Sequence, residues 1–283
     1  MQKVAIVTDS TADLPRGTYE EHGIVVVPLL VHFGDEIYRD GVDLSSDEFY
    51  DKLVSSKILP RTSQPSPHDF QVVYGDLASK SEEIVSIHLS SKLSGTYQSA
   101  TIAAGMMKDT KVRVIDGKGA SAATGLLVLE AARLAGSGAT ADDIVARIDH
   151  LIEGMVVFFT VDTLEYLEKN GRIGKATAFL GTLLSIRPLL QLYDGEVTPF
   201  EKVRGSKAKV LARMIAAAKE RAPSGKRLRA AIMHGAVPEE AAALRQTVER
   251  ELACDEILTA CLGPVIGSHA GPGTLGLAFY PVD

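Results

Sequence analysis

A serine-rich turn at residues 90–96 carries the side chains with the clearest chemical potential. It reads Ser-Ser-Lys-Leu-Ser-Gly-Thr and follows residues 84–89, an apolar run of strand character. Beyond Gly95 small and apolar residues recur at helical spacing, which predicts a helix. Free N–H groups at a helix N-terminus, flanked by hydroxyls, form an anion-binding site. Ser94 is the expected N-cap, and capping alone would also explain a serine at this position.

Two further polar turns and two basic residues are candidates for the same chemistry. Residues 8–13 and 116–120 also follow strand-like runs, and in open parallel sheets ligands bind beyond the carboxyl ends of strands. Arg172 follows a predicted helix end, and His269 lies in a predicted glycine- and proline-rich loop over residues 263–273. A loop Arg or His is also commonly a surface or capping residue, so both readings stay open.

The sequence predicts neither a metal site nor a cofactor. Asp9 and Asp13 could hold a cation, but no His or Cys accompanies them at ligand spacing, and helix capping explains both. Cys254 and Cys261 are too widely spaced for a C-x-x-C pair. Residues 271–276 fit G-x-G-x-x-G, but no strand directly precedes them and too little chain follows for a βαβ unit.

Catalysis has weaker support than oxyanion binding. The chain contains no G-x-x-x-x-G-K-[ST], H-E-x-x-H or G-x-S-x-G motif. Ser94 with His269 is conceivable as the nucleophile and base of a hydrolase, but nothing nominates a third, orienting carboxylate. Hydroxyls, a helix start, an arginine and a histidine together favour a site that binds an anion.

Composition narrows the class of partner. The 283 residues carry a net charge of −6 with 6% aromatic residues and no Trp, which argues against nucleic-acid binding. The two cysteines show no disulfide or zinc-ligand spacing, and the N-terminus lacks the apolar core of a signal peptide. Both observations indicate a reduced, cytoplasmic protein. No apolar run is long enough for a transmembrane segment, so at most transient membrane contact is expected.

The pattern of elements predicts an α/β fold in two domains. Strands alternate with helices through residues 1–153, which indicates a Rossmann-like domain with a parallel sheet, and residues 24–33 look like one strand region of it. Residues 154–283 change to an α+β pattern, with a hairpin at Asp194-Gly195 and a small-residue helix at about 175–184.

With these residues assembled, the chain resembles the DegV family, which includes the fatty-acid-binding subunits of bacterial fatty acid kinase. Five separated motifs carry the resemblance in the expected order and span nearly the whole chain. They are Thr-Asp-Ser-Thr-Ala-Asp-Leu-Pro at 8–15, Thr-Ser-Gln-Pro at 62–65, the turn at 90–97, Asp-Thr-Leu-Glu-Tyr-Leu at 162–167 with Gly-Arg-Ile-Gly at 171–174, and Gly-Pro-Val-Ile-Gly at 263–267 with His269 and Gly-Pro-Gly at 271–273.

The resemblance implies one long-chain fatty acid buried between the two domains. Thr62 and Ser94 are then expected to hydrogen-bond its carboxylate, with Ser63, Gly95 and Thr96 lining the same pocket. Arg172 and His269 match basic positions near the head group, where an acyl phosphate would need them. The acyl tunnel is expected to be lined by small and aliphatic helices such as 122–129 and 176–184.

The implied role is a non-catalytic one, in which the protein presents the carboxylate to a separate fatty acid kinase catalytic subunit. Two departures from the family pattern bear on it. Asp-Gly-Lys-Gly at 116–119 lacks the usual hydroxyl after the aspartate, and Glu-Lys-Asn at 168–170 is less basic than usual and weakens a kinase-docking surface. A lipid or acyl-phosphate hydrolase using Ser94 and His269, and a lipid carrier or sensor without a kinase, are the alternatives.

Overall fold

The computed structural model describes residues 2–181 and 186–282, and within them the strands form three sheets. The first sheet is parallel throughout and has the order β2-β1-β6-β7. Its strands are rich in apolar residues because helices cover both of its faces. These strands are β1 (Gln2–Asp9), β2 (Val25–Val27), β6 (Ser81–His88) and β7 (Lys111–Asp116).

The second sheet is mixed and has the order β10-β9-β8-β13-β11-β12. Only the β11–β12 pair is parallel among its described ladders. Helices α8 (Lys207–Arg221) and α9 (Pro238–Glu251) cover its outer face, where they share an apolar core with it. Its strands are β8 (Val156–Thr160), β9 (Ile186–Tyr193), β10 (Glu196–Arg204), β11 (Arg227–His234), β12 (Cys254–Cys261) and β13 (Leu275–Val282).

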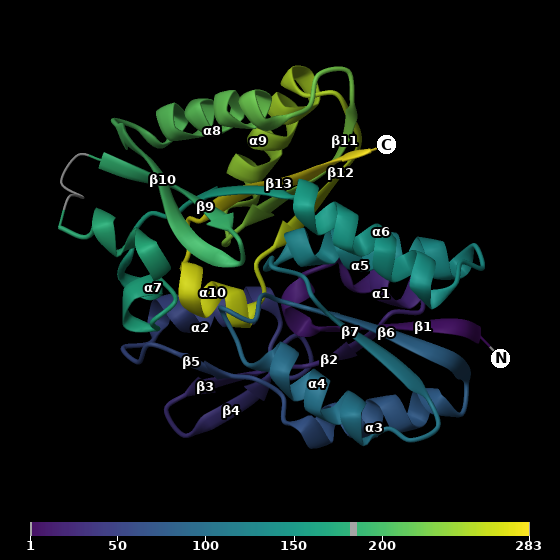
Figure 1. Ribbon diagram of the computed structural model, residues 1–283. Helices are drawn as coiled ribbons and strands as arrows, with labels where there is room; N and C mark the ends of the chain where they lie inside the picture. The colour runs from purple at the N-terminus through teal and green to yellow at the C-terminus, as the bar shows by residue number, and fades with distance from the viewer. Residues whose placement is uncertain (1, 182–185, 283) are drawn as a thin grey trace.

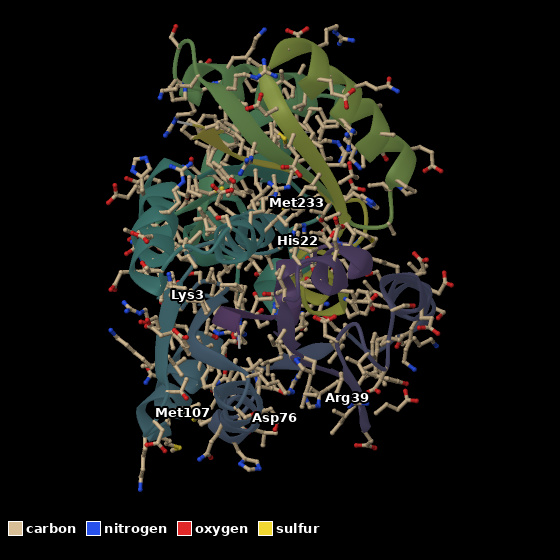
Figure 2. All side chains as sticks on the ribbon, turned by 90° about the vertical axis from the view of Figure 1, so that its right-hand side faces the viewer. Lys3, His22, Arg39, Asp76, Met107 and Met233 are labelled. Carbon is tan, nitrogen blue, oxygen red and sulfur yellow. The ribbon has the colours of Figure 1, made fainter. Side chains whose placement is uncertain are left out.

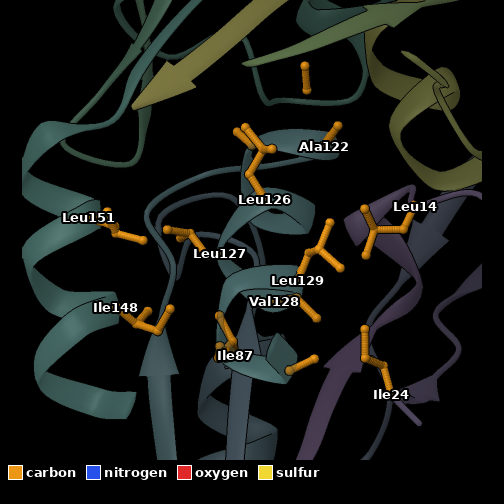
Figure 3. Close-up of a cluster of buried hydrophobic side chains, with 14 of the residues drawn as sticks. Leu14, Ile24, Ile87, Ala122, Leu126, Leu127, Val128, Leu129, Ile148 and Leu151 are labelled. Atoms are coloured by element: carbon orange, nitrogen blue, oxygen red, sulfur yellow. The ribbon is translucent and has the colours of Figure 1, made fainter. Parts of the chain in front are cut away.

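Helices α5 (Ala122–Gly136) and α6 (Ala141–Gly154) lie between these two sheets (Figure 1). Every residue of α5 from Ala122 to Ala132 is buried, and one core joins this helix to both sheets (Figure 3). A helix that is apolar on all sides is expected to be buried on all sides. Glu130, one of its few charged residues, pairs with Arg229 on β11 and so ties α5 to the second sheet.

The opposite face of the parallel sheet is covered by α3 (Pro67–Ala78) and α4 (Thr96–Met106). In the turned view of Figure 2, Asp76 and Met107 mark this layer, and Met233 lies at the junction with the second sheet. A small antiparallel sheet of order β4-β3-β5 packs on α2 (Ser46–Ser55). Its strands are β3 (Leu30–Phe33), β4 (Glu36–Arg39) and β5 (Arg61–Ser63).

The shorter helices lie close to the edges of these layers. They are η1 (Ser10–Ala12), α1 (Arg16–Glu21), α7 (Glu165–Lys169), η2 (Gly174–Phe179) and α10 (Pro264–Ala270). Within the described ranges, no helix is long and apolar enough to cross a bilayer.

The predicted α/β class, with a parallel sheet followed by an α+β half, is confirmed. The single strand region over 24–33 is wrong, because Pro28 separates β2 from β3 and the two strands enter different sheets. The predicted helix at 175–184 is a 3-10 helix that ends at Phe179, and 182–184 lie outside the described residues. The division into 1–153 and 154–283 stays a prediction, since α5 and α6 share a core with both sheets.

Candidate functional site

A cavity opens between the parallel sheet and the six-stranded sheet, at the carboxyl ends of the parallel strands. It encloses about 920 Å³ of space, the open solvent at its mouth included. Most of its wall is apolar and comes from Leu29, Leu89, Leu93, Val157, Phe159, Leu167, Leu192, Val197, Met233, Leu262, Val265 and Ile266. The polar side chains on it are Thr62, Ser63, Gln64, Ser94, Ser121, Arg172, His269 and Thr274.

The serine-rich turn is fixed to its surroundings where it follows β6, at Leu89 and Ser90. The Asp9 carboxylate oxygen Oδ2 accepts from the Leu89 backbone N–H at 3.1 Å and lies 2.9 Å from His88 Nδ1. The Ser90 N–H donates to the Gly119 carbonyl at 2.8 Å, and its hydroxyl donates to the Gly195 carbonyl at 2.7 Å. The turn therefore bridges both sheets before it reaches the cavity.

Ser94 presents its hydroxyl to the cavity but does not cap α4. The N-cap of α4 is Gly95, so the predicted capping role of Ser94 is wrong. The Ser94 Oγ instead accepts from the Thr96 N–H at 3.3 Å and lies 2.9 Å from the Thr96 hydroxyl oxygen. This local side-chain-to-backbone turn competes with the capping geometry and leaves Ser94 one residue outside the cap.

Gly95 and Thr96 themselves lie outside the described lining of the cavity. Thr96 is fully buried and supports Ser94 from behind. The Gln64 side chain lies directly over Gly95, where a Cβ atom would meet the amide end of Gln64. A side chain at position 95 would displace this flexible amide from the turn, and sequence reasoning did not single out Gln64.

Thr62 and Ser63 reach the cavity from β5 and have different partners. The Thr62 hydroxyl oxygen lies 2.8 Å from His269 Nε2, so two predicted site residues that are far apart in sequence meet here. The Ser63 hydroxyl is bonded to His32 Nε2 at 2.9 Å. Since a hydroxyl donates one proton, Ser63 has less capacity for a ligand than its position alone indicates.

His269 is held in place by α10, a helix where a loop was predicted. Gly263 is its N-cap and Pro264 occupies its first position, a placement that suits proline because the missing N–H would be unbonded anyway. Asp13 accepts from the Gly263 N–H at 3.1 Å and anchors the start of the helix. Local sequence gives a weak signal for a helix this short, so a loop was the natural expectation.

The imidazole of His269 is neutral at physiological pH. Burial and, to a smaller extent, the nearby charge of Arg172 lower its pKa to about 4. Within the described ranges its buried Nδ1 has no hydrogen-bond partner, while Nε2 faces Thr62. With its proton on Nε2 the neutral imidazole donates to the Thr62 hydroxyl oxygen and leaves the Thr62 proton for a ligand oxygen.

Arg172 lies exposed on the cavity wall, just after Gly171, whose φ of 69° suits glycine at the end of α7. Its Nε donates to the Leu93 carbonyl at 3.1 Å, and its Nη1 donates to the Asn170 carbonyl at 2.8 Å. These bonds aim the guanidinium without neutralising its charge, and among the described side chains no carboxylate pairs with it. The positive charge beside the polar end of the cavity remains available to an anion.

Two further polar residues on the wall were not singled out from the sequence. Ser121 is only 2% exposed, and its hydroxyl lies close to the Asp13 carboxylate. It has a φ of 54°, which is unusual for a residue with a side chain. Thr274 donates to the Ala270 carbonyl at 2.9 Å and supports the helix that carries His269. The unusual backbone conformation at Ser121 cannot be recognised from the sequence.

The predicted lining by 122–129 and 176–184 is wrong for the residues that the structure describes. None of 122–129 or 176–181 lies on the cavity wall, and 182–184 fall outside the described ranges. The aliphatic side chains of α5 pack in the core between the two sheets instead. Ala176 and Phe179 pack on Leu190 and Val197 of the second sheet instead.

Two acidic residues, Asp13 and Asp40, hold α10 in position. Besides Asp13, a buried Asp40 lies close to Gly263. Burial and the charge of Asp40 raise the pKa of Asp13 well above its ordinary value, and burial raises the pKa of Asp40 to about 7. Across residues 2–181 and 186–282, no group of three acidic, His or Cys side chains is placed to hold a metal ion.

Ser94 and His269 share the cavity wall without forming a catalytic pair. Nε2 of His269 faces Thr62, and no carboxylate of a described residue is bonded to its Nδ1. A hydrolase base requires such an orienting partner to stabilise the imidazolium that forms. The arrangement is therefore suited to binding an oxyanion at one end of an apolar cavity.

Comparison with known proteins agrees with this arrangement. A family model described as an uncharacterised protein of the DegV family matches residues 3–282. The DegV domain-containing protein of Halalkalibacterium halodurans is 39% identical, over 99% of each chain. A fatty-acid-binding DegV family protein of Thermus thermophilus is 40% identical with a TM-score of 0.94, over 99% of this chain and 100% of the other.

DegV of Bacillus subtilis, whose crystal structure is described as that of a fatty acid binding protein, is 34% identical with a TM-score of 0.91 and full coverage of both chains. The match to the family model covers nearly the whole sequence, as do the relatives. The chain belongs to the DegV family.

Proposed function

We propose that the protein binds a long-chain fatty acid in the cavity between its two sheets. The observation that carries this proposal is the asymmetry of the cavity, which is apolar over most of its wall and polar where Thr62 meets His269 beside Arg172. A ligand with a long apolar tail and one oxyanion matches both parts. The fatty acids bound by the Thermus and Bacillus relatives have this chemistry.

The free energies of apolar burial and of hydrogen bonding favour such a ligand. Burying about fourteen methylenes at about 0.8 kcal/mol each contributes roughly 11 kcal/mol before the entropy cost of association. Hydrogen bonds to a charged carboxylate contribute about 1.5–3 kcal/mol each and set the orientation. A buried carboxylate without such partners would be costly, so the polar end is required as well as the apolar wall.

We further propose that the bound carboxylate is presented to a separate kinase and leaves as an acyl phosphate. Arg172 supports this step because it is exposed, lies on the cavity wall and has no carboxylate partner among the described residues. Thr62 and Ser94 are only partly exposed and suit the carboxylate itself. In this role the protein is a cytoplasmic carrier and needs no cofactor of its own.

The division of labour between these residues is testable. In Arg172→Ala, fatty acid affinity is expected to change by less than about threefold, because the carboxylate contacts remain. Phosphorylation of the bound fatty acid by a fatty acid kinase is expected to fall, because the transferred phosphoryl group loses its positive partner. Titration calorimetry and a radiolabelled phosphate assay measure the two effects. An equal loss of binding would show that Arg172 holds the carboxylate.

A hydrolase that uses Ser94 and His269 is the competing function. Incubating the purified protein with acyl phosphate alone distinguishes the two. Phosphate release at the rate seen in buffer supports the carrier. Faster release that is lost in Ser94→Ala would identify an enzyme.

A further inference from the structure

The start of α10 is held by two carboxyl groups that share one buried site. Asp13, which follows η1, accepts from the Gly263 N–H at 3.1 Å, and Asp40, which follows β4, accepts from the Val265 N–H. Their Oδ1 atoms lie 2.6 Å and 3.4 Å from the point where a Cβ atom at Gly263 would sit. Both residues are less than a tenth exposed. The helix that carries His269 therefore begins on two neighbouring acids.

No positive charge balances this pair within the described ranges. Neither carboxyl forms an ion pair there, and the charges that act on them are negative, those of each other and of Asp9, which is itself bonded to His88. The other titratable groups that face the pair are neutral because burial raises their pKa, and they are Tyr19 on α1, Tyr50 on α2 and Cys261 on β12.

The pair retains a proton at neutral pH. Two adjacent buried carboxyls without a cation resist losing both protons. Asp13 Oδ2 is buried without a hydrogen-bond partner among the described residues, a costly position for a charged oxygen. Burial and the acidic neighbours raise the pKa of Asp13 well above its ordinary value, and burial raises the pKa of Asp40 to about 7. A second negative charge therefore develops only as the pH rises.

Both acids are attached to the cavity wall. Ser10 donates to Asp40 at 2.8 Å and accepts from the N–H of Leu29 at 3.0 Å, and Leu29 lines the cavity. Ser121, beside the Asp13 carboxyl, lines it as well. The helix that the pair anchors supplies four more wall residues, which are Val265, Ile266, His269 and Ala270. A change at the pair therefore reaches the wall through direct contacts.

We propose that the Asp13–Asp40 pair is a pH-sensitive anchor, which holds α10 against the cavity while it keeps a proton and lets the helix move when that proton is lost. This inference rests on the proposed fatty acid binding, which supplies its readout. A second buried negative charge repels the first, and relief requires one carboxylate to leave the start of α10. An acyl tail enclosed by the same wall displaces water and disfavours that charge further. Binding therefore takes up a proton, and affinity falls as the pH rises.

Palmitate titrations between about pH 6.5 and 8.5 test this proposal, with wild-type affinity expected to fall about threefold to tenfold. Asp40→Asn keeps the size of the side chain but cannot ionise, so it is expected to remove most of this fall. Asp43→Asn is the matched control, because Asp43 is exposed and paired with Arg39, which lowers its pKa to about 2. It stays ionised throughout, so its loss is expected to preserve the wild-type profile. Titration of the palmitate itself is common to all three proteins.

The proton that accompanies binding can be counted directly. Calorimetric titration near neutral pH in phosphate and in Tris, whose ionisation enthalpies differ, gives the number of protons taken up. The wild type and Asp43→Asn are expected to take up more than Asp40→Asn does. Thermal unfolding without ligand checks that each variant is folded. If Asp40→Asn does not fold, Asp13→Asn replaces it, because that variant removes the same repulsion.

The outcomes separate this inference from the proposed function. If the wild type binds no palmitate at any pH, both are overturned. If the wild type binds palmitate and Asp40→Asn shows the same pH profile and the same proton uptake, only the pH-sensitive anchor is wrong. A wild-type affinity that rises with pH would likewise overturn the anchor and leave the fatty acid site standing.

Discussion

Ser94→Ala is the substitution whose effect on fatty acid binding follows most directly from the structure. The hydroxyl faces the cavity, accepts from the Thr96 N–H at 3.3 Å and lies 2.9 Å from the Thr96 hydroxyl oxygen. Those contacts orient it and leave one of its hydrogen-bonding directions for a ligand. Removing it deletes one hydrogen bond to the carboxylate and leaves the apolar wall intact.

The expected loss is about 1.5–3 kcal/mol, which is a rise in Kd of roughly tenfold to 150-fold. The free protein also loses stability, by about 1 kcal/mol, because the buried Thr96 loses a partner. Calorimetric titration with palmitate measures the first effect, and thermal unfolding without ligand measures the second. Measuring both prevents a folding defect from being mistaken for a binding defect.

Ser91→Ala is the matched control in the same turn. The Ser91 side chain is exposed and bonds to Asp116, away from the cavity wall. Its loss is expected to change palmitate affinity by less than about twofold. Equal weakening in the two variants, or no weakening in Ser94→Ala, would refute the assignment of Ser94 to the carboxylate.

Three further predictions concern the site and its scaffold. Ser63→Ala is expected to weaken palmitate binding less than Thr62→Val does in the same titration, because Thr62→Val also removes the partner of His269, which lines the cavity, whereas Ser63 is bonded to His32, which does not. The pKa of His269 is lowered from 6.5 to about 4 in the folded protein. The free energy of unfolding is therefore expected to fall by about 3 kcal/mol as the pH drops from 6.5 to about 4. The unfolded chain takes up a proton that the buried ring does not, so denaturant titrations should show a flatter pH dependence in His269→Gln. Glu130→Ala is expected to lower the free energy of unfolding by about 1–3 kcal/mol in urea titrations, since Arg229 loses its buried partner and keeps the longer contact to Glu256. An unchanged urea midpoint would show that this ion pair does not couple α5 to the second sheet.

Periodicity and the family motifs were sufficient for the class of fold and for the family. The helix and strand patterns are strong where the elements are long, as in α5 and β13. They fail where tertiary contacts decide. Pro28 interrupts a run that is otherwise almost entirely apolar, and α10 is a short helix fixed at its start by Asp13, which lies 250 positions before Gly263.

The candidate site was predictable in its residue types and only partly in its geometry. Thr62, Ser94, Arg172 and His269 all reach the cavity wall, as their resemblance to family motifs implied. The neutral state of His269 could not be read from the sequence, because it depends on burial and on the distance to Arg172.

The apolar wall was the least predictable part of the site. Helices with small aliphatic residues were expected to line the acyl tunnel, but the side chains of α5 pack in the core between the two sheets. The wall comes instead from strand residues and loops on both sides of the cavity, including Val157, Met233 and Gly276. The local sequence pattern does not predict which face of a strand will line a cavity.

A crystal structure of the protein with palmitate tests the central claim most directly. The account predicts the carboxylate within hydrogen-bond distance of the Thr62 and Ser94 hydroxyls, with the tail enclosed between the two sheets. A ligand bound outside this cavity, or bound with its tail toward Thr62 and its carboxylate among the apolar residues, would contradict it.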